Sequence, residues 1–366
     1  MKFTIDRESL LKPLQQVIGV VERRQTLPVL GNLLVVASDD GLQITATDLE
    51  VEIQARSSVE IEEGGEITLP ARKLVDICKA LPENAKIQFS VKDQKAQIRS
   101  GKSRFTLSTL PAADFPLVEK IQSDCQFSIS QNKLKEIIDR TQFSMAQQDV
   151  RYYLNGLMLE MDNGLLRAVA TDGHRLALCD MDVEINVKDS RQVIVPRKGI
   201  QELQRLMEGS DEPVRVEVGT NHIRIQTDGV CFTSKLVDGR FPDYERVVPK
   251  GGDKLVVADR ELFRQALSRT SILSNEKYRG IRLNLEKNNI KIQAHNPEQE
   301  EADEEFEVDY NGNGLEIGFN VTYLLDVLSS VRSDNVEITL SDSNSSCLIR
   351  QPGTEQYRYV VMPMRL

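Results

Sequence analysis

LQITATD, residues 42–48, recurs as LRAVATD at 166–172 and more weakly as IKIQAHN at 290–296, so each step is 124 residues. In each copy apolar residues occupy every second position, which is the period of a half-buried strand. Self-similarity at one long, fixed interval is the signature of a repeated structural unit. The sequence therefore predicts three copies of one domain.

Two amphipathic helices accompany each copy of this strand. Apolar residues at helical spacing run through 10–21, 134–141 and 262–270, and a second set runs through 74–81, 200–207 and 323–331. The second set begins after Pro70, Pro196 and Asn320, which suit a first helical turn or an N-cap. Strands fall in runs between the helices, so the fold class is α+β. We expect domains at 1–122, 123–250 and 251–366, each with two helices packed on antiparallel sheets.

The charge is unevenly distributed along the chain. The formal net charge is −10, but residues 298–309, EQEEADEEFEVD, hold eight carboxylates and no base. Such a run is either a solvated loop or an electrostatic partner for a basic patch on another subunit. The expected helices carry bases that should face solvent if their apolar stripes face the sheets, and a basic surface binds phosphates without reading sequence. These bases include Arg7, Lys12, Arg23, Arg24, Arg72, Lys73, Lys79, Lys133, Lys135, Arg140, Arg197, Lys198, Arg205, Arg264 and Arg269.

Composition argues for a cytoplasmic location. No apolar run approaches the roughly 20 residues of a membrane span, and the charges at Lys2, Asp6, Arg7 and Glu8 leave no room for a signal peptide. Five cysteines stand far apart, with no metal-type spacing, as expected for reduced structural thiols. We expect no metal and no cofactor.

Few residues suggest chemistry. Asp172 and His174 could act as a general base pair in a hydrolase, but an Asp that follows Ala-Thr at a strand end more often caps a turn. The adjacent Tyr152 and Tyr153 are expected in a strand, with one ring buried and the other exposed. An exposed ring beside Gln148 and Arg151 can lie on a nucleic acid strand.

The chain strongly resembles the bacterial DNA polymerase III beta subunit family, the sliding clamps. The resemblance covers nearly the whole chain and rests on long strings such as MKFTIDRESLLKPLQQV (1–17), TQFSMAQQDVRYYLNG (141–156), ATDGHRLA (170–177), FTSKLVDGRFPDYERV (232–247) and YVVMPMRL (359–366). It implies a head-to-tail dimer that closes a six-domain ring around duplex DNA, with no catalytic activity. Implied partners are double-stranded DNA, a second copy of the chain, and proteins that carry short linear motifs: the replicative polymerase alpha subunit, the clamp-loader delta subunit, translesion polymerases, mismatch-repair proteins and ligase.

The resemblance also assigns three sites. DNA contacts are implied at Arg24, Arg72, Gln148, Tyr152 and Tyr153. A partner-peptide groove between the second and third domains is implied at Arg151, Leu154, Thr171, Gly173, His174, Arg175, Leu176, Pro242, Arg246, Val247, Tyr278, Asn320, Tyr323, Asn344, Ser346, Val360, Val361, Met362, Pro363, Met364, Arg365 and Leu366. Tyr278 replaces the usual Phe and Asn344 a usual aliphatic residue, which makes the groove slightly more polar.

The ring interface is implied to join the two ends of the chain. One face carries Lys73, Lys102, Arg104, Phe105 and Leu107, and the other carries Ile272, Leu273, Glu298, Glu300, Glu301 and Glu304. Bases lie in the first repeat and the acidic run lies in the third, so unlike ends of two chains can attract each other, as a head-to-tail arrangement requires. Such an interface forms a closed ring only when the rotation between subunits returns to its start. A monomeric peptide-binding adaptor that never encircles DNA is the alternative.

The last residues of the sequence allow two interpretations. In isolation, residues 360–366, VVMPMRL, suggest an edge strand followed by a frayed tail. Because Pro363 cannot donate a ladder hydrogen bond, pairing should end there and leave Met364 beside the groove.

Overall fold

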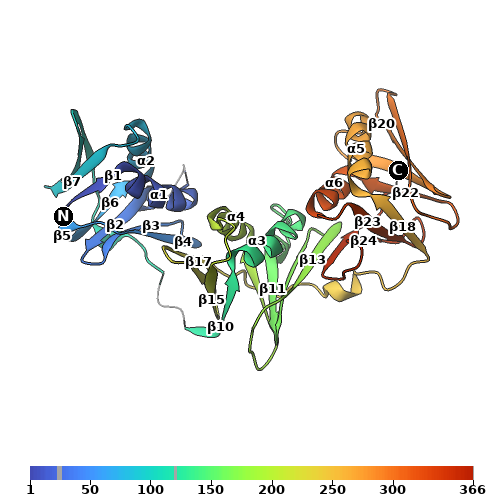
Figure 1. Cartoon of the computed structure of the whole chain (residues 1–366), viewed down its shortest axis with the longest axis horizontal. Helices are drawn as coiled ribbons and strands as arrows, with labels where there is room; N and C mark the ends of the chain where they lie inside the picture. The colour runs from blue at the N-terminus through green and yellow to red at the C-terminus, as the bar shows by residue number, and fades with distance from the viewer. Residues whose placement is uncertain (23–26, 119–121, 366) are drawn as a thin grey trace. The chain divides into compact units, whose positions relative to one another are not determined.

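The computed structural model describes residues 1–22, 27–118 and 122–365. The chain forms two compact units: a first unit of Met1–Asn132 with Lys198–Leu236, and a second unit of Lys133–Arg197 with Val237–Leu366. Each unit is described by itself, and the elements of both are labelled in Figure 1.

The first unit contains two antiparallel sheets. A five-stranded sheet has the order β5-β1-β7-β8-β9, with β5 Ile61–Glu63, β1 Lys2–Asp6, β7 Lys86–Lys92, β8 Lys95–Ser100 and β9 Ser103–Ser108. An eight-stranded sheet has the order β10-β15-β16-β17-β4-β3-β2-β6, with β10 Ser123–Ser130, β15 Pro213–Gly219, β16 His222–Gln226, β17 Val230–Lys235, β4 Val51–Ser57, β3 Gly41–Thr47, β2 Asn32–Ser38 and β6 Gly65–Pro70. The pairing of β17 with β4 joins strands from two repeats in one sheet.

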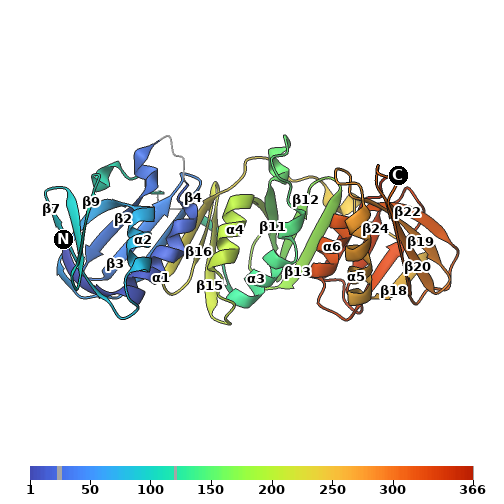
Figure 2. The same cartoon turned by 90° about the horizontal axis from the view of Figure 1, so that it is seen from above.

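Three helices belong wholly or mostly to the first unit. They are α1 Arg7–Val17, α2 Ala71–Ala80 and α4 Arg197–Leu206, and Figure 2 shows α1 and α2 side by side. The last carbonyls of a helix need donors from outside it. Arg205 of α4 donates to the carbonyls of Gln15 (2.9 Å) and Gln16 (2.5 Å) in the last turn of α1. This contact ties a helix of the second repeat to one of the first.

The second unit also contains two antiparallel sheets. An eight-stranded sheet has the order β14-β11-β12-β13-β25-β24-β23-β18, with β14 Arg191–Pro196, β11 Gly156–Asp162, β12 Leu165–Thr171, β13 Arg175–Asp182, β25 Tyr357–Val361, β24 Cys347–Arg350, β23 Asn335–Leu340 and β18 Lys254–Asp259. A four-stranded sheet has the order β21-β20-β19-β22, with β21 Glu301–Glu307, β20 Asn289–His295, β19 Gly280–Glu286 and β22 Leu315–Asn320. Its helices are α3 Gln131–Asp139, α5 Arg260–Thr270 and α6 Val321–Ser330.

Short 3₁₀ turns complete both units. Those of the first are η1 Ile18–Val20, η2 Pro28–Gly31 and η3 Ala112–Asp114. Those of the second are η4 Gln142–Ser144, η5 Tyr152–Leu154, η6 Tyr244–Arg246 and η7 Ser271–Leu273.

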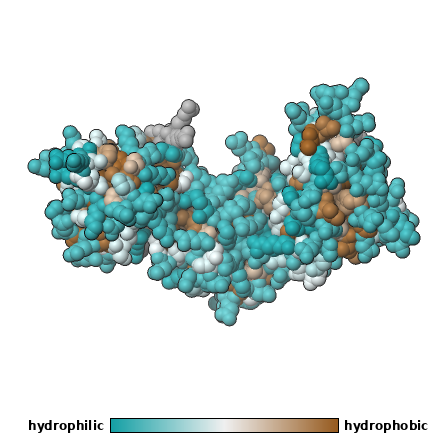
Figure 3. All heavy atoms as spheres, turned by 45° about the horizontal axis from the view of Figure 1, so that its top comes forward, coloured by the Kyte–Doolittle hydropathy of each residue, from teal (hydrophilic) through white to brown (hydrophobic). Residues whose placement is uncertain are grey.

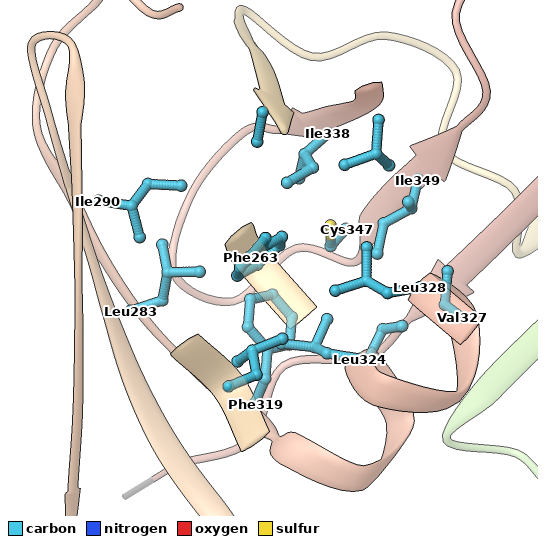
Figure 4. Packing of buried hydrophobic residues seen from close by; sticks show 14 of the residues in the cluster. Phe263, Leu283, Ile290, Phe319, Leu324, Val327, Leu328, Ile338, Cys347 and Ile349 are labelled. Atoms are coloured by element: carbon cyan, nitrogen blue, oxygen red, sulfur yellow. The ribbon is translucent and has the colours of Figure 1, made fainter. Parts of the chain in front are cut away.

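The largest core cluster of the second unit lies between α5, α6 and the strands of the third repeat. Figure 4 shows Phe263 of α5, Phe319 of β22 and Leu324 of α6 converging with Ile338 of β23. Burying each such side chain stabilises the fold by about 1.5–3 kcal/mol relative to leaving it exposed. The helical stripes expected from the sequence therefore form the core. Leu262 is the exception, because it is 53% exposed.

The α+β prediction of three repeats is confirmed. In the described residues each repeat contains two helices and eight or nine strands. The two joins between repeats are also alike: Val51 pairs with Ser234 across β4 and β17, and Arg175 pairs with Val361 across β13 and β25. Just beyond each pair a backbone amide donates to a carbonyl at 2.8 Å, Lys235 to Glu50 and Met362 to His174.

The expectation that every helical base faces solvent is wrong for several arginines, among them Arg197, which is partly buried and donates to the Met145 carbonyl at 3.0 Å. Arg140 is only 3% exposed; it pairs with Glu136 at 3.2 Å, donates to the Ser330 carbonyl and lies 4.4 Å from the centre of the Tyr357 ring. Arg7 is partly buried because its Nε donates to the carbonyl of Cys78 at 2.8 Å. Backbone carbonyl groups accept hydrogen bonds from these guanidinium groups, which therefore do not face solvent.

The cysteines lie as expected for structural thiols. None of the five, all within the described residues, forms a disulfide, and four of them are buried. Burial raises the pKa of Cys78 and of Cys179 to about 12. These thiols are therefore protonated at neutral pH and are poor nucleophiles.

The surface is mainly polar. On the face in Figure 3 hydrophilic residues predominate and hydrophobic residues form small, separate groups. The large apolar side chains that are exposed include Leu27, Leu49, Leu117, Val150, Tyr152, Leu255, Ile272 and Tyr278. No helix among the described residues is both long and apolar enough to cross a membrane.

Candidate functional site

The turn between β12 and β13 is built by its own side chains. The Asp172 carboxylate accepts hydrogen bonds from the backbone amides of His174 (2.9 Å) and Arg175 (3.0 Å), and Thr171 Oγ1 accepts one from Gly173 at 3.1 Å. Gly173 has φ +88°, a backbone conformation that favours glycine. Asp172 is therefore a turn cap, as the sequence indicated, and its lone pairs serve the backbone instead of a reaction.

The first repeat contains the same turn. There the Asp48 carboxylate accepts from the amides of Glu50 (2.9 Å) and Val51 (2.7 Å). Leu49 stands in the place of Gly173 and has φ +78°. The shared geometry shows that the turn belongs to the repeated fold, and it disfavours the interpretation of Asp172 and His174 as a hydrolytic pair.

Arg175 is held on all sides within the second unit. Its side chain, 11% exposed, donates to Asp172 Oδ2 at 3.1 Å and to the Phe143 carbonyl at 2.7 Å, and it pairs with Asp326. The guanidinium carbon also lies 4.6 Å from the centre of the Tyr323 ring. Arg175 thus fixes the wall of the site and has few donors left for a ligand.

Three expected groove residues form a continuous apolar floor. Leu154, Leu176 and Val360 are 2%, 1% and 0% exposed and belong to one core cluster, with Val247 packed against it. Leu176 and Val360 are cross-strand partners in β13 and β25. The floor therefore depends on a strand of the third repeat that lies beside a strand of the second.

The segment after β25 runs along this floor. β25 lies between β13 and β24, so the interpretation of residues 360–366 as an edge strand is wrong. The β25 ladder ends at Val361, two residues before Pro363, where it was expected to end, and Met364 donates its amide to the carbonyl of Gly318 at 2.9 Å. Ser346 Oγ lies 3.0 Å from Met362 Sδ. Leu366 lies outside the described residues.

The start of α6 supplies the opposite wall. Asn320 caps the helix by accepting from the Thr322 amide at 2.9 Å, and its Nδ2 donates to the Tyr278 carbonyl at 3.3 Å. The rings of Tyr323 and His174 stack with their centroids 6.4 Å apart and an interplanar angle of 22°. His174 is exposed, so its ring is available to a ligand.

Other expected groove residues lie at the surface. Arg246 has a side chain 84% exposed and pairs with Asp243 at 2.7 Å, while Asn344 is exposed in a turn capped by Asp342. Pro242 is exposed next to the buried Phe241, and Arg365 is exposed as well. Among the described residues no hydrogen bond or ion pair joins the side chain of Asn344 or Arg246 to the floor.

Residues 148–153 include three of the expected nucleic-acid contacts. Tyr152 is 56% exposed and Tyr153 is partly buried, with ring centroids 5.8 Å apart. They lie in the 3₁₀ turn η5 and not in a strand, so that expectation is wrong, although one ring is exposed as predicted. Gln148 is exposed and has φ +56°.

Two sets of side-chain hydrogen bonds, from Arg151 and from Asn155, hold this loop at Asp149. Asp149 accepts from the side chain of Arg151 at 2.9 and 3.0 Å, which lowers the pKa of Asp149 to about 2. Asn155 exchanges two hydrogen bonds with the Asp149 backbone, at 2.8 and 2.9 Å. Arg151 also reaches the Asp172 carbonyl at 3.4 Å, which links the loop to the turn before β13.

Many helical bases are neutralised by carboxylates of the chain itself. Arg205 pairs with Glu202, Arg264 with Glu261, and Arg269 with Glu304. In the described part of the chain, Arg72, Lys73 and Lys79 of α2 have no ion-pair partner, and Arg72 donates only to the Val21 carbonyl at 2.9 Å. α2 is therefore the helix whose charge is most available to a phosphate. Arg24 lies outside the described residues.

The two sets of expected interface residues lie on or near the edge strands β9 and β21, on α2 and in η7. Lys102 and Arg104 are exposed at β9, which also carries the partly buried Phe105 and the buried Leu107, and Lys73 is exposed on α2. Glu301 and Glu304 lie on the edge strand β21, and Ile272, 76% exposed, precedes the partly buried Leu273 in η7. Glu304 already pairs with Arg269 at 2.6 Å, and Glu300 accepts from Asn296 Nδ2 at 2.6 Å, while Glu298 is exposed.

Sequence reasoning missed the residues that support the groove from behind. Asp326 and the Phe143 carbonyl hold Arg175, and Asn155 holds Asp149. Their partners are distant in sequence or are backbone atoms, so no local pattern identifies them. Among the described ranges no group of three or more potential ligand side chains could hold a metal ion.

Family models match the chain along most of its length. The models of the DNA polymerase III beta subunit match the chain in three parts: the N-terminal domain at 1–119, the central domain at 128–243 and the C-terminal domain at 245–365. The beta sliding clamp of Pseudomonas aeruginosa is 61% identical and that of Escherichia coli K12 is 54% identical, with 100% of each chain covered in both comparisons.

Solved structures agree with the sequence comparisons. A ligand-bound DNA polymerase sliding clamp from P. aeruginosa matches with a TM-score of 0.97 and 61% identity, covering 100% of both chains. The pol III beta of Caulobacter crescentus matches with a TM-score of 0.94 at 40% identity, again covering 100% of both chains.

Proposed function

The chain belongs to the DNA polymerase III beta subunit family, the beta sliding clamps, and from this premise we propose how its residues close a ring, hold DNA and dock partners. It is a DNA sliding clamp and a processivity factor, not an enzyme. Its partners are DNA, a second copy of the chain and proteins that bind through motifs. We place it in the cytoplasm, where chromosomal DNA is replicated, with domains bounded near 122 and 250.

Ring closure rests on one observation. Both internal joins pair a strand of one repeat with a strand of the next in the same register, and β9 and β21 are the counterparts left as free edges. β9 carries Arg104 beside Lys102, whereas β21 reads EADEEFE. The free edges are thus complementary in charge, which favours pairing of unlike ends.

The internal joins also predict the register between protomers. By their place in the strand ladders, Glu52 and Leu176 correspond to Glu301, and their partners Thr233 and Val360 correspond to Thr106. We expect Glu301 opposite Thr106 of the partner subunit. A shift of one residue would turn every side chain to the other face of the sheet.

Engineered cysteines test this register. Glu301→Cys combined with Thr106→Cys should form a disulfide that links two protomers, whereas Ala302→Cys with Thr106→Cys should not, because residues 302 and 106 point to opposite faces of the sheet. Mass measured after mild oxidation distinguishes the outcomes. Equal linking of both pairs, or of neither, would contradict the register.

Apolar contacts should hold the interface. Ile272 and Leu273 are expected to dock on Phe105 and Leu107 of the neighbour. Ile272→Ala with Leu273→Ala should yield monomers, at a cost of about 2–5 kcal/mol for each large side chain lost from a packed site. Light scattering at nanomolar concentration should then give 41.3 kDa instead of twice that mass. A wild-type mass of one chain would favour the monomeric adaptor.

DNA should be held through its backbone and without sequence preference. Arg24, Arg72 and Gln148 would contact phosphates, with Tyr152 and Tyr153 packing on the strand. Arg72→Ala should weaken binding equally for all sequences and reduce the salt slope by about 1. Lys12→Ala, on the first helix, is the control, because Lys12 already faces Glu208 at 3.5 Å. Encirclement itself predicts retention on nicked circular DNA and loss from linear DNA.

The groove should take a short peptide with a Gln and an apolar Leu/Phe pair. Its apolar end would lie on Leu154, Leu176 and Val360, beside the exposed ring of His174. We propose the replicative polymerase alpha subunit, the clamp-loader delta subunit, translesion polymerases, mismatch-repair proteins and ligase as the partners that bind there.

A truncation tests the groove. Deleting Met362–Leu366 removes the segment beyond β25 but leaves its ladder to β13 intact. Peptide binding should be lost, while dimer mass and retention on circular DNA remain. A truncated ring that captured a polymerase tail peptide with unchanged affinity would refute the assignment.

A further inference from the structure

Tyr278 is exposed at a position where the other two repeats have a buried side chain. The strands β2, β11 and β19 begin alike, since Asn32, Gly156 and Gly280 each pair with the residue before the second helix of their repeat. Two residues earlier, the first and second repeats have Leu30 and Leu154, each 2% exposed. The third repeat has Tyr278 there, and it is 56% exposed.

A pocket of about 420 Å³ opens beside Tyr278, lined by residues that include Asn275, His295, Pro297, Met364 and Arg365. This volume is within the range of about 300–1,000 Å³ that is usual for ligand pockets. His295 and Pro297 lie outside the groove proposed above, and Tyr278 and Met364 border both, so the pocket continues the groove beyond its polar end.

The second repeat shows what fills the matching space elsewhere. There Leu154 packs in one core cluster with Phe241, which is 5% exposed. Phe115 is the counterpart of Phe241 in the first repeat and is also buried, at 6% exposed. A buried aromatic ring thus packs at this corner in the second repeat and its counterpart is buried in the first, whereas this corner of the third repeat holds the pocket beside Tyr278.

We propose that this pocket binds an aromatic side chain that a partner peptide carries upstream of its docking motif. The inference rests on the proposed groove, whose floor ends near Val360. From Val360 to Met364 an extended chain covers about 13 Å, so a peptide with its apolar pair on the floor reaches the pocket about four residues earlier. An aromatic ring is the occupant that the fold itself uses at the corresponding corners.

Fluorescence anisotropy with three labelled peptides tests the proposal. One peptide carries only the motif, and two carry an upstream extension that differs only in Phe or Ala at the position four residues before the apolar pair. We expect the Phe peptide to bind the full-length protein about tenfold more tightly than the Ala peptide, because aromatic burial outweighs the cost of ordering the extension.

Two variants that fill the pocket locate the effect. His295→Trp and Pro297→Trp should abolish the difference between Phe and Ala peptides while leaving the motif peptide unaffected. His222→Trp, at the start of β16, is the matched control and should preserve the difference. A benzophenone side chain in place of Phe should crosslink to Met364 or Pro297, as located by mass spectrometry.

The outcomes separate this inference from the groove on which it rests. Normal binding of the motif peptide with no gain from Phe would overturn the pocket and leave the groove standing, as expected if Tyr278 itself closes the space in solution. A gain that survives both Trp variants would also overturn it. Failure of the motif peptide to bind would refute the groove and this inference together.

Discussion

Replacing Arg175 with Ala should damage the groove through the fold and not through a lost contact with the ligand. The side chain lies behind the turn that carries His174, where it bonds Asp172 and the Phe143 carbonyl and pairs with Asp326. Removing it takes this donor from Asp326 and from the Phe143 carbonyl, and it leaves Asp172 with only its two backbone amide donors. The turn and the start of α6, where Tyr323 stacks on the guanidinium, would then lose their common support.

The expected loss of stability follows from the burial of this network. Arg175 is 11% exposed and Asp172 is 17% exposed, but Asp326 is 37% exposed, so its pairing is weakened by solvent. Removing one partner of a buried ion pair costs about 3–5 kcal/mol. After the discount for Asp326 we expect about 3 kcal/mol, which moves a urea midpoint by about 1 M at an m-value of about 3 kcal/mol/M.

Urea unfolding followed by circular dichroism measures the loss, and hydrogen exchange in β13 should show that it is local. Arg246→Ala is the control, because this exposed arginine of the same site pairs only with Asp243 and should cost about 0–1 kcal/mol. A change below about 1 kcal/mol in Arg175→Ala, with peptide affinity lost, would refute the reasoning and make Arg175 a direct ligand contact.

Three further perturbations test the electrostatics and the loops. The Asp149 carboxyl should titrate near pH 2 by NMR, because its hydrogen bonds with Arg151 hold its pKa below the ordinary 3.8. The stability that this ionised carboxylate contributes is fully present above pH 3.8 and is lost as the pH falls through about 2. A titration midpoint near pH 4 would contradict the pairing of Asp149 with Arg151. Burial raises the pKa of Glu52, which accepts a hydrogen bond from the Val118 amide at 2.9 Å, so the stability of the fold should fall as the pH rises above 4.5. Thermal melts between pH 4.5 and 7 should show that Glu52→Gln removes this pH dependence. An unchanged dependence of stability on pH would show that Glu52 is not its source. Asn155→Ala should cost about 1–3 kcal/mol by leaving the Asp149 backbone groups unpaired, as measured in urea, with Asn163→Ala as the surface control; equal losses would argue against the loop clamp.

Periodicity predicted most of the fold. Strand and helix periods, with Pro70, Pro196 and Asn320 as helix starts, indicated six helices, and all six are present in the described residues. The failures were side-chain environments. Leu262 fits a helical stripe but is exposed, and Arg140 looks like a surface base but is buried against Tyr357, because the sequence does not say which element packs against a given helix face.

The candidate site was predictable in part for the same reason. Asp172 was expected to cap a turn, since its donors are the next few amides of the chain. The adjacent tyrosines were expected in a strand, whereas the clamp between Asp149 and Asn155 folds them into a 3₁₀ turn. The local sequence also could not show whether β25 is an edge strand or a central strand, because its neighbour β13 lies more than 170 residues earlier in the chain.

The sequence by itself determined the threefold repeat, the α+β class, the turn at Asp172 and the family, because these depend on local periods and short-range hydrogen bonds or on strings that stand unchanged in the chain. Only the tertiary structure decided that β25 completes the sheet of the second repeat and that Arg175 supports the groove from behind. It also decided that the exposed Tyr278 borders a pocket, whereas the two other repeats bury a leucine at this position. Each of these depends on which distant surfaces meet, and contacts between residues far apart in the chain leave no periodic trace in the sequence.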